Sequence, residues 1–199
     1  MIIALIDSGV NVVDDYFCEI PAEYLSPLAS LGRAIRSSRR YCLSFKSHEY
    51  DLRVPVLTPA SGCISHPLVL WPSEKLPRRK YPASAYLFAV SLYLSSQLSM
   101  REVAERTRQK FGLEKFSHST LSRALKKLLQ NANSIWEASV PFFTNPHPPL
   151  LEVRRRWTSS MISMAGKLLE ALHPVLEDPK EGAHIAYRFF CESGGSFIL

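Results

Sequence analysis

Cysteine is scarce in this sequence, and the residues present are far apart. Cys18, Cys42, Cys63 and Cys191 form no Cys-x-x-Cys pair, so nothing indicates a secreted disulfide framework. The N-terminus, MIIALIDSG, has no cationic segment and reaches Asp7 after a short apolar run, so no signal peptide is expected. The expected location is therefore the reducing environment of the cytoplasm.

Charge is absent from one long stretch, Tyr81 to Met100. This length raises the question of a membrane span. Ser84, Ser91 and Ser95 would share one helical face, and Pro82 shortens the usable helix. The apolar part is about a dozen residues long, which suits a buried core helix better than a bilayer. No membrane association is expected.

Positive charge is concentrated in one segment. Lys75 to Gln130 holds 12 Lys and Arg residues against 3 Glu, although the formal charge of the whole chain is only +6. The segment starts within a basic stretch, Trp71 to Lys80, which we interpret as a linker into the first helix. Concentrated basic surfaces attract phosphate backbones through counterion release. The charge distribution therefore favours nucleic acid as the partner.

The same segment has the pattern of a helix-turn-helix. Ser99 and Glu102 have capping-box spacing at the start of one helix, and Gly112 suits the left-handed position after its end. A second helix begins near Ser117, with Ser117 or Ser119 as its cap. Leucines and an alanine recur on its inner face at helical spacing: Leu121, Ala124, Leu125, Leu128 and Leu129. Leu113 and Phe116 are expected to tie the turn to the core.

The outer face of the second helix is polar at its start and basic further along. Recognition helices place short hydrogen-bonding side chains against base edges and cations against phosphates of double-stranded DNA. The residues predicted to contact DNA are Arg101, His118, Ser119, Thr120, Ser122, Arg123, Lys126 and Lys127. The alternative is a solvated basic face on a helical protein-interaction adaptor.

The N-terminus offers a second alternative, a protease. Ile2 to Ile6 is predicted to be a buried strand, and the Asp7-Ser8-Gly9 turn after it resembles the catalytic aspartate motif of retroviral-type aspartic proteases and of subtilisin-like proteases. The subtilisin interpretation lacks its downstream histidine and serine motifs. The aspartic protease interpretation needs a second carboxylate from a homodimer and regularly spaced strands. We favour a plain strand-to-turn signal.

Residues 41–80 are proline-rich and are predicted to be irregular. Cys63 and His66 have the spacing of a zinc knuckle, whereas Cys42 and His48 are too far apart. A zinc site needs four converging ligands, so a buried thiol with a loop histidine is the favoured interpretation. No metal or other cofactor is expected.

PRRKY at 77–81, the apolar helix after it, LSMREVAERTRQKFG and FSHSTLSRALKKL together resemble the N-terminal part of insertion-sequence transposases and related small proteins. In that family a zinc-ribbon-like segment precedes a helix-turn-helix that binds the ends of the element. The resemblance covers roughly residues 60 to 130 and implies that five side chains face DNA: Ser119, Thr120, Ser122, Arg123 and Lys126.

Two departures from this family limit what the resemblance implies. Only Cys63 and His66 remain of a zinc ribbon's ligands. The rest of the chain is too short and too helical to supply the ribonuclease-H-like domain that cleaves DNA. The resemblance therefore implies a DNA-binding protein that is not an enzyme, either a truncated relic or a stand-alone family member.

The C-terminal residues are expected to form a long helix, from about Leu150 to Asp178, after a linker at Phe142 to Pro149. Its apolar residues have coiled-coil spacing: Trp157, Met161, Met164, Leu168, Ala171 and Val175. A homodimer through the 154–176 helix is one interpretation, and packing of this helix on its own domain is the favoured one. Arg154, Arg155 and Arg156 are candidates for further phosphate contacts.

The predicted fold class is mainly α, with a three-helix helix-turn-helix core. Residues 1–74 form an irregular N-terminal region that includes small β elements and a degenerate zinc-ribbon-like part at 41–74. Residues 75–130 are predicted to form the DNA-binding domain, and residues 131–199 a C-terminal helical region with a short last helix near His184 to Cys191.

Overall fold

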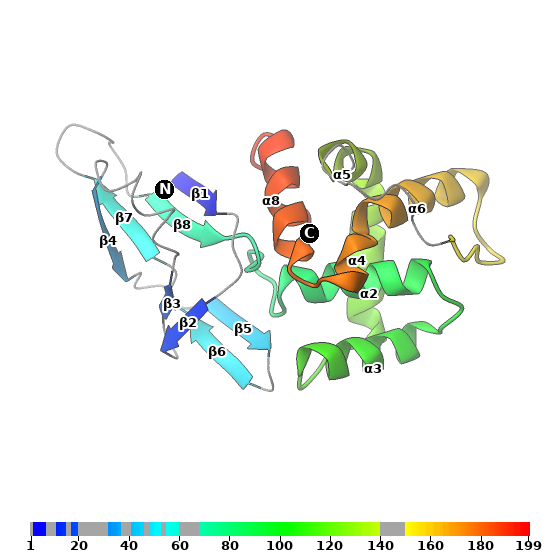
Figure 1. Cartoon of the computed structure of the whole chain (residues 1–199), viewed down its shortest axis with the longest axis horizontal. Helices are drawn as coiled ribbons and strands as arrows, with labels where there is room; N and C mark the ends of the chain where they lie inside the picture. Colours follow the sequence, from blue (N-terminus) through cyan, green and yellow to red (C-terminus); the bar gives the residue numbers. More distant parts are fainter. Residues whose placement is uncertain are drawn as a thin grey trace.

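In the described residues, strands and helices occupy separate parts of the chain: the strands precede residue 73 and the helices follow residue 82 (Figure 1). The helical part is the larger, which confirms the predicted fold class, mainly α with a small β region. The structure is a computed structural model, and it describes residues 2–6, 11–14, 17–19, 32–36, 41–45, 48–52, 55–59, 68–139 and 150–199.

The N-terminal part contains a four-stranded mixed sheet in the order β1-β8-β7-β4. Its first strand lies parallel to its last, with Ile2 opposite Leu68 and Ile6 opposite Pro72, and the other pairs are antiparallel. Two hairpins, β2-β3 and β5-β6, lie beside it (Figure 1). The strand bounds are β1 Ile2–Ile6, β2 Asn11–Asp14, β3 Phe17–Glu19, β4 Gly32–Arg36, β5 Tyr41–Phe45, β6 His48–Leu52, β7 Pro55–Pro59 and β8 Leu68–Pro72.

The strand predicted at Ile2 to Ile6 is confirmed, but the irregular region predicted at 41–80 is wrong because it contains four strands. Three of the prolines that suggested irregularity lie at strand ends: Pro55 and Pro59 bound β7, and Pro72 ends β8. Proline is tolerated at strand ends, where its missing N–H interrupts little of the ladder. Asp7, Cys63 and His66 lie outside the described residues.

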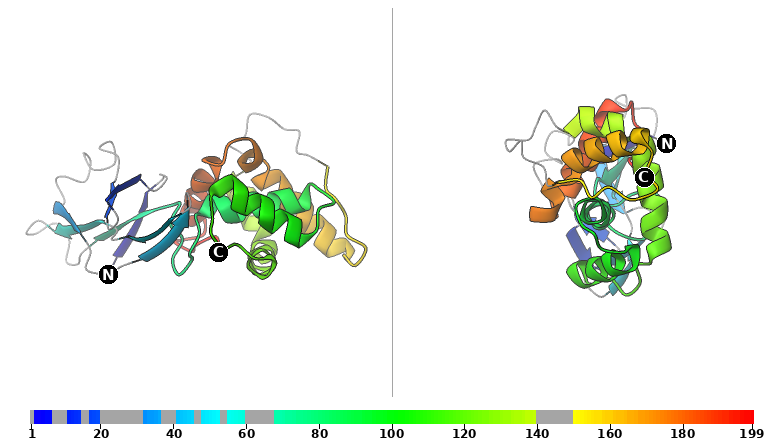
Figure 2. Two further views of the ribbon diagram at one scale, coloured as in Figure 1. Left: turned by 90° about the horizontal axis from the view of Figure 1, so that it is seen from below. Right: turned by 90° about the vertical axis from the view of Figure 1, so that its right-hand side faces the viewer.

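Helix α2 is the central element of the helical part. It packs against α3, α4, α6, α7 and α8, and the views in Figures 1 and 2 show these helices around it. Every residue from Tyr81 to Ser91 is buried, as expected for a helix that is apolar on all sides. The helix bounds are α2 Ala83–Leu94, α3 Met100–Phe111, α4 His118–Gln130, α5 Ala132–Ser139, α6 Ser159–Leu172, α7 Pro174–Glu177 and α8 Glu181–Glu192.

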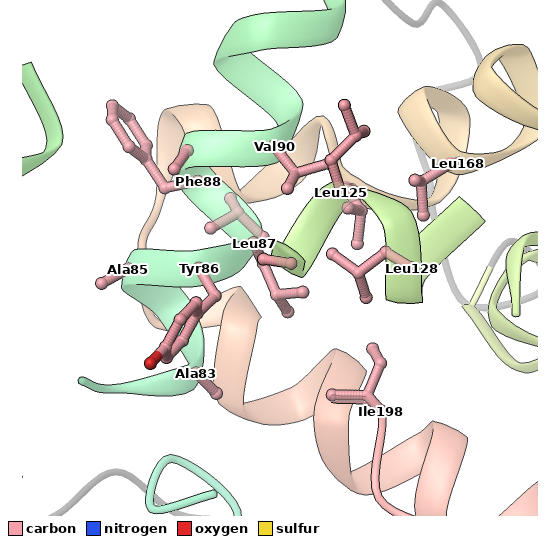
Figure 3. Close-up of a cluster of buried hydrophobic side chains, with 14 of the residues drawn as sticks. Ala83, Ala85, Tyr86, Leu87, Phe88, Val90, Leu125, Leu128, Leu168 and Ile198 are labelled. Carbon is pink, nitrogen blue, oxygen red and sulfur yellow. The ribbon is translucent and has the colours of Figure 1, made fainter. Parts of the chain in front are cut away.

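The hydrophobic core continues past residue 130. Leu87 and Val90 of α2 lie against Leu125 and Leu128 of α4, and Ile198 from the end of the chain approaches the same cluster (Figure 3). Only Asn131 separates α4 from α5. The segments 75–130 and 131–199 therefore share one core in the described residues, and the packing shows no break where a domain boundary was predicted. Among the described helices, none is both long and apolar enough to span a bilayer.

The prediction of one long helix from Leu150 to Asp178 is wrong in its extent. The same holds for the 154–176 helix of the dimer interpretation. Residues 150–158 are not helical, α6 begins at Ser159, and Pro174 begins the separate short helix α7. Leu168, Ala171 and Val175 of the predicted seam are fully buried in the core of this chain. This part of the seam packs on its own domain, as the favoured interpretation stated.

The segment predicted to be a basic linker is largely buried. Lys75 is 2% exposed, and its ammonium group donates to the carbonyl oxygens of Leu76 at 2.8 Å and Arg79 at 2.7 Å. Trp71 Nε1 donates to the Lys75 carbonyl. Ser44 N of β5 donates to the Lys80 carbonyl at 2.7 Å, which joins the strands to the start of the helical part. Lys75 therefore contributes no charge to a surface.

A carboxylate lies at the start of α2. The Glu74 carboxylate accepts hydrogen bonds from the amide of Ser84, at 3.3 Å, and from its hydroxyl. The Glu74 carbonyl accepts from Ala83 N at 2.8 Å. Burial raises the pKa of Glu74 to about 7, against the smaller opposing effects of the Ser84 hydrogen bonds and of His184. Glu74 is thus protonated in the folded chain at a pH where it is ionised in the unfolded chain.

This raised pKa predicts a pH-dependent stability. The contribution of Glu74 to the stability of the fold is greatest below its ordinary pKa of 4.5. This contribution is lost as pH rises towards about 7, because the folded state then holds a proton that the unfolded state has released. We expect the free energy of unfolding to fall by roughly 2 kcal/mol between pH 5 and pH 8. This is less than the energy equivalent of the full pKa difference, because the Glu74 side chain is partly accessible to solvent. Urea unfolding of wild type and Glu74→Gln at both pH values isolates this loss. Equal pH dependence in the two proteins would contradict it.

Candidate nucleic-acid interface

The first helix of the predicted pair begins and ends as its sequence indicates. Ser99 Oγ accepts from Glu102 N at 3.3 Å, and the Glu102 carboxylate accepts from Ser99 N at 2.8 Å, so the capping box is present. The side-chain hydrogen bond with Ser99 is the main reason that the pKa of Glu102 is lowered. Gly112 follows α3 with φ 56° and ψ 46°, the left-handed conformation that favours glycine.

The second helix, α4, is capped by Ser117 and not by Ser119. Ser117 Oγ accepts from Thr120 N at 3.2 Å, and its hydroxyl lies 2.8 Å from that of Ser119 and 3.0 Å from that of Thr120. The hydroxyl groups of Ser119 and Thr120 therefore use part of their hydrogen-bonding capacity on the Ser117 hydroxyl. The first turn of α4 is held in a fixed conformation at the end that would meet base edges.

The connection between α3 and α4 is anchored in the core. Leu113 and Phe116 are buried, which confirms their predicted role. The centre of the Phe116 ring lies 5.1 Å from that of Tyr81 and 5.8 Å from that of Tyr86. Both pairs are tilted, a geometry that aromatic rings prefer over face-to-face stacking. The connection spans the six residues 112–117, longer than the 3–4 residues of the common helix-turn-helix.

The outer face of α4 is accessible as predicted. Its inner residues are buried, apart from Leu129, which is half-buried. Of the residues predicted to contact DNA, only Thr120 is half-buried, and the other seven are exposed: Arg101, His118, Ser119, Ser122, Arg123, Lys126 and Lys127. The structure brings all but Arg101 together on α4, and Arg101 lies in the first turn of α3.

The charge of this face is not neutralised by its own helix, because α4 contains no Asp or Glu. Arg123 Nε donates to the Ser119 carbonyl at 3.2 Å, which keeps the guanidinium close to the helix surface. On α3, Arg108 lies 3.5 Å from Glu105, so this cation is partly compensated. The cations of α4 therefore have no carboxylate on their own helix, whereas α3 carries both signs of charge with an excess of cations.

Arg154, one of the candidates for phosphate contact, is engaged with its own chain. Its guanidinium donates to the carbonyl oxygens of Tyr93 at 3.0 Å, Ser96 at 2.5 Å and Leu98 at 3.1 Å, and it lies 4.3 Å from the centre of the Tyr93 ring. This side chain holds the end of α2 and the turn into α3. Arg155 and Arg156 are exposed and remain candidates for phosphate contact.

A pocket of about 420 Å³ lies beside α4, and sequence reasoning missed it. Its lining combines residues of α4 with one residue each from α2 and α3 and with the residues before and within α6: Tyr93, Met100, Ser122, Leu125, Lys126, Leu129, Gln130, Trp157, Met161 and Met164. The signal lies in the apolar spacing of Trp157, Met161 and Met164, which by itself predicts a helical seam. These three side chains are half-buried, unlike the rest of that seam.

Cys42 is exposed, so the buried thiol expected there is wrong. Within the part of the chain that the structure describes, no three His, Cys, Asp or Glu side chains lie close enough together to hold a metal ion.

Comparison with known proteins adds no relative: no family model, no curated protein and no solved structure matches this chain. The interpretation of the site therefore depends on its geometry and charge.

Proposed function

We propose that this chain binds double-stranded DNA through a helix-turn-helix in which α4 is the recognition helix. The observation that carries the proposal is the outer face of α4, which is exposed, basic and without an acidic residue, over an inner face fixed in the core. His118, Ser119 and Ser122 supply hydrogen-bonding groups for base edges, and Arg123, Lys126 and Lys127 supply charge for bases or phosphates.

The resemblance to the N-terminal part of insertion-sequence transposases makes the ends of a mobile element the natural DNA class. The proposal is limited to contact with DNA in the cytoplasm and includes no strand cleavage. A homodimer would present two copies of α4 to two half-sites. Because Leu168, Ala171 and Val175 are already buried, a dimer through residues 154–176 would have to use Trp157, Met161 and Met164.

The test compares single alanine variants on duplex DNA. Arg123→Ala and Lys126→Ala are each expected to weaken DNA binding about tenfold, because each removes one base or phosphate contact. Neither should lower Tm, since both side chains are exposed. Lys180→Ala is the matched control, because this exposed cation lies before α8, outside α3 and α4. Fluorescence anisotropy with a labelled duplex measures the affinities, after selection from a random-sequence pool.

The outcome of this test also separates the alternative function, a helical adaptor that binds an acidic protein. A sequence motif enriched from the pool supports DNA recognition, and a palindromic motif supports a dimer as well. Equal affinities for wild type, Arg123→Ala and Lys126→Ala would contradict the proposal. If no duplex is retained, the basic face of α4 is better explained as the surface of an adaptor.

A further inference from the structure

The pocket beside α4 has the size and composition of a small-molecule site. Its volume, about 420 Å³, lies within the range of roughly 300–1,000 Å³ that is usual for ligand pockets. Its wall is mostly apolar and includes two aromatic side chains, Tyr93 and Trp157. Met100, Met161 and Met164 supply flexible thioether chains that adapt to a ligand's shape and contact aromatic rings favourably.

The polar groups of the lining are few, and apart from the Tyr93 hydroxyl and the Trp157 indole N–H they lie on α4. Ser122 and Gln130 can each donate and accept hydrogen bonds, and Lys126 is the only charged residue of the lining. An apolar wall with one cation at its edge matches a ligand with an apolar body and one negative group. A ligand cation would meet Lys126 without a compensating carboxylate among the lining residues.

We propose that this pocket binds a small organic acid with an aromatic body and a single carboxylate. The aromatic body lies between Trp157, Tyr93 and the methionines, where burial of apolar surface supplies the affinity. The carboxylate pairs with the Lys126 ammonium and accepts a hydrogen bond from Ser122 or Gln130. The lysine thus selects acids over neutral molecules of the same shape.

The position of the pocket gives the ligand a regulatory effect, an extension that rests on the proposed DNA-binding function. Ser122 and Lys126 belong both to the pocket lining and to the residues predicted to contact DNA. A carboxylate paired with Lys126 neutralises one of the charges that would meet a phosphate or base. Saturation with the acid is therefore expected to weaken duplex binding severalfold.

The test uses naphthalene-2-carboxylate and its neutral counterpart naphthalene-2-methanol, titrated calorimetrically into the full chain without DNA. We expect the acid to bind at least about tenfold more tightly than the alcohol, the usual discrimination from one charge-assisted contact. Lys126→Met should abolish this preference while leaving binding of the alcohol intact. Lys115→Met is the matched control: this exposed lysine lies on the connection before α4, outside the pocket, and its loss should leave the preference unchanged.

A second variant locates the aromatic body. Trp157→Ala is expected to weaken the binding of both compounds about tenfold, because it removes the largest side chain of the lining. Its circular dichroism and Tm establish that it folds. No binding of either compound, equal binding of both by wild type, or an unchanged preference in Lys126→Met would overturn the proposal. A dimer that covers Trp157 in the absence of compound would overturn it too. Because the titration contains no DNA, it succeeds or fails independently of the DNA-binding function.

Discussion

Replacement of Gly182 with alanine is expected to lower the free energy of unfolding by about 2 kcal/mol, through overpacking of a helix crossing. Gly182 lies in the first turn of α8, where this helix crosses α2. A Cβ at this position would lie 2.5 Å from Cα and 2.8 Å from Cβ of Ser84. The obstacle is the backbone of α2, which cannot turn aside as a flexible side chain could. The two helices must separate, and the core between them loses contact.

Gly166→Ala is the matched control for this substitution. Gly166 lies in the interior of α6, and an added Cβ would meet nothing within 4 Å. Alanine there should raise the free energy of unfolding by about 0.5–1 kcal/mol, because it restricts the unfolded chain and favours the helix. The same chemical change is therefore expected to alter the free energy of unfolding with opposite signs at the two positions, and urea unfolding of both variants measures this. A stabilising Gly182→Ala would contradict the close crossing of α2 and α8.

This crossing matters to the proposed DNA surface because α2 is the support for α3 and α4. Ser84 touches both Gly182 and the Glu74 carboxylate, so one turn of α2 is held from the strand side and from the C-terminal side of the chain. Loosening this turn should act on DNA binding only through the fraction of folded protein. At temperatures well below its Tm, Gly182→Ala is expected to bind DNA as wild type does.

The helices α3 and α4 were largely predictable because their signals are local. The Ser99 capping box, the left-handed Gly112 and the Ser117 cap each involve residues within four positions of one another. The inner face of α4 follows from a helical period that a short sequence window reveals. Only the identity of the α4 cap was left open between Ser117 and Ser119, and the structure selects Ser117.

Features that depend on distant contacts were not predictable in the same way. The apolar spacing of residues 157–175 is real, but it cannot reveal whether the stripe faces a second chain or its own core. The answer lies in the packing of α6 against α2 and α5. Likewise, a count of charges does not distinguish Lys75, which is buried among carbonyl groups, from the exposed lysines of α4. The pocket requires α4 and residues 157–164 to meet, and no local pattern specifies that meeting.

The role of Arg154 also depends on distant contacts, and its replacement is the second large effect that we expect. Arg154→Ala should lower the free energy of unfolding by about 3 kcal/mol, because several charge-assisted hydrogen bonds are lost together. The lost partners include the carbonyl oxygens of Tyr93, near the end of α2, and of Ser96 and Leu98 in the turn that follows. The cation also lies favourably at the negative end of the α2 dipole and over the Tyr93 ring.

Two further variants separate this positioning role from a role in phosphate binding. Arg154→Lys should recover only part of the stability, since one ammonium group cannot reach the set of carbonyls that the guanidinium spans. Arg155→Ala should change stability little, because Arg155 is exposed and makes no hydrogen bond or ion pair with the described residues. Thermal unfolding and duplex binding are measured for all three. If Arg154 acted mainly on phosphate, Arg154→Ala would weaken DNA binding at an unchanged Tm, which is the reverse of the result that its contacts with α2 predict.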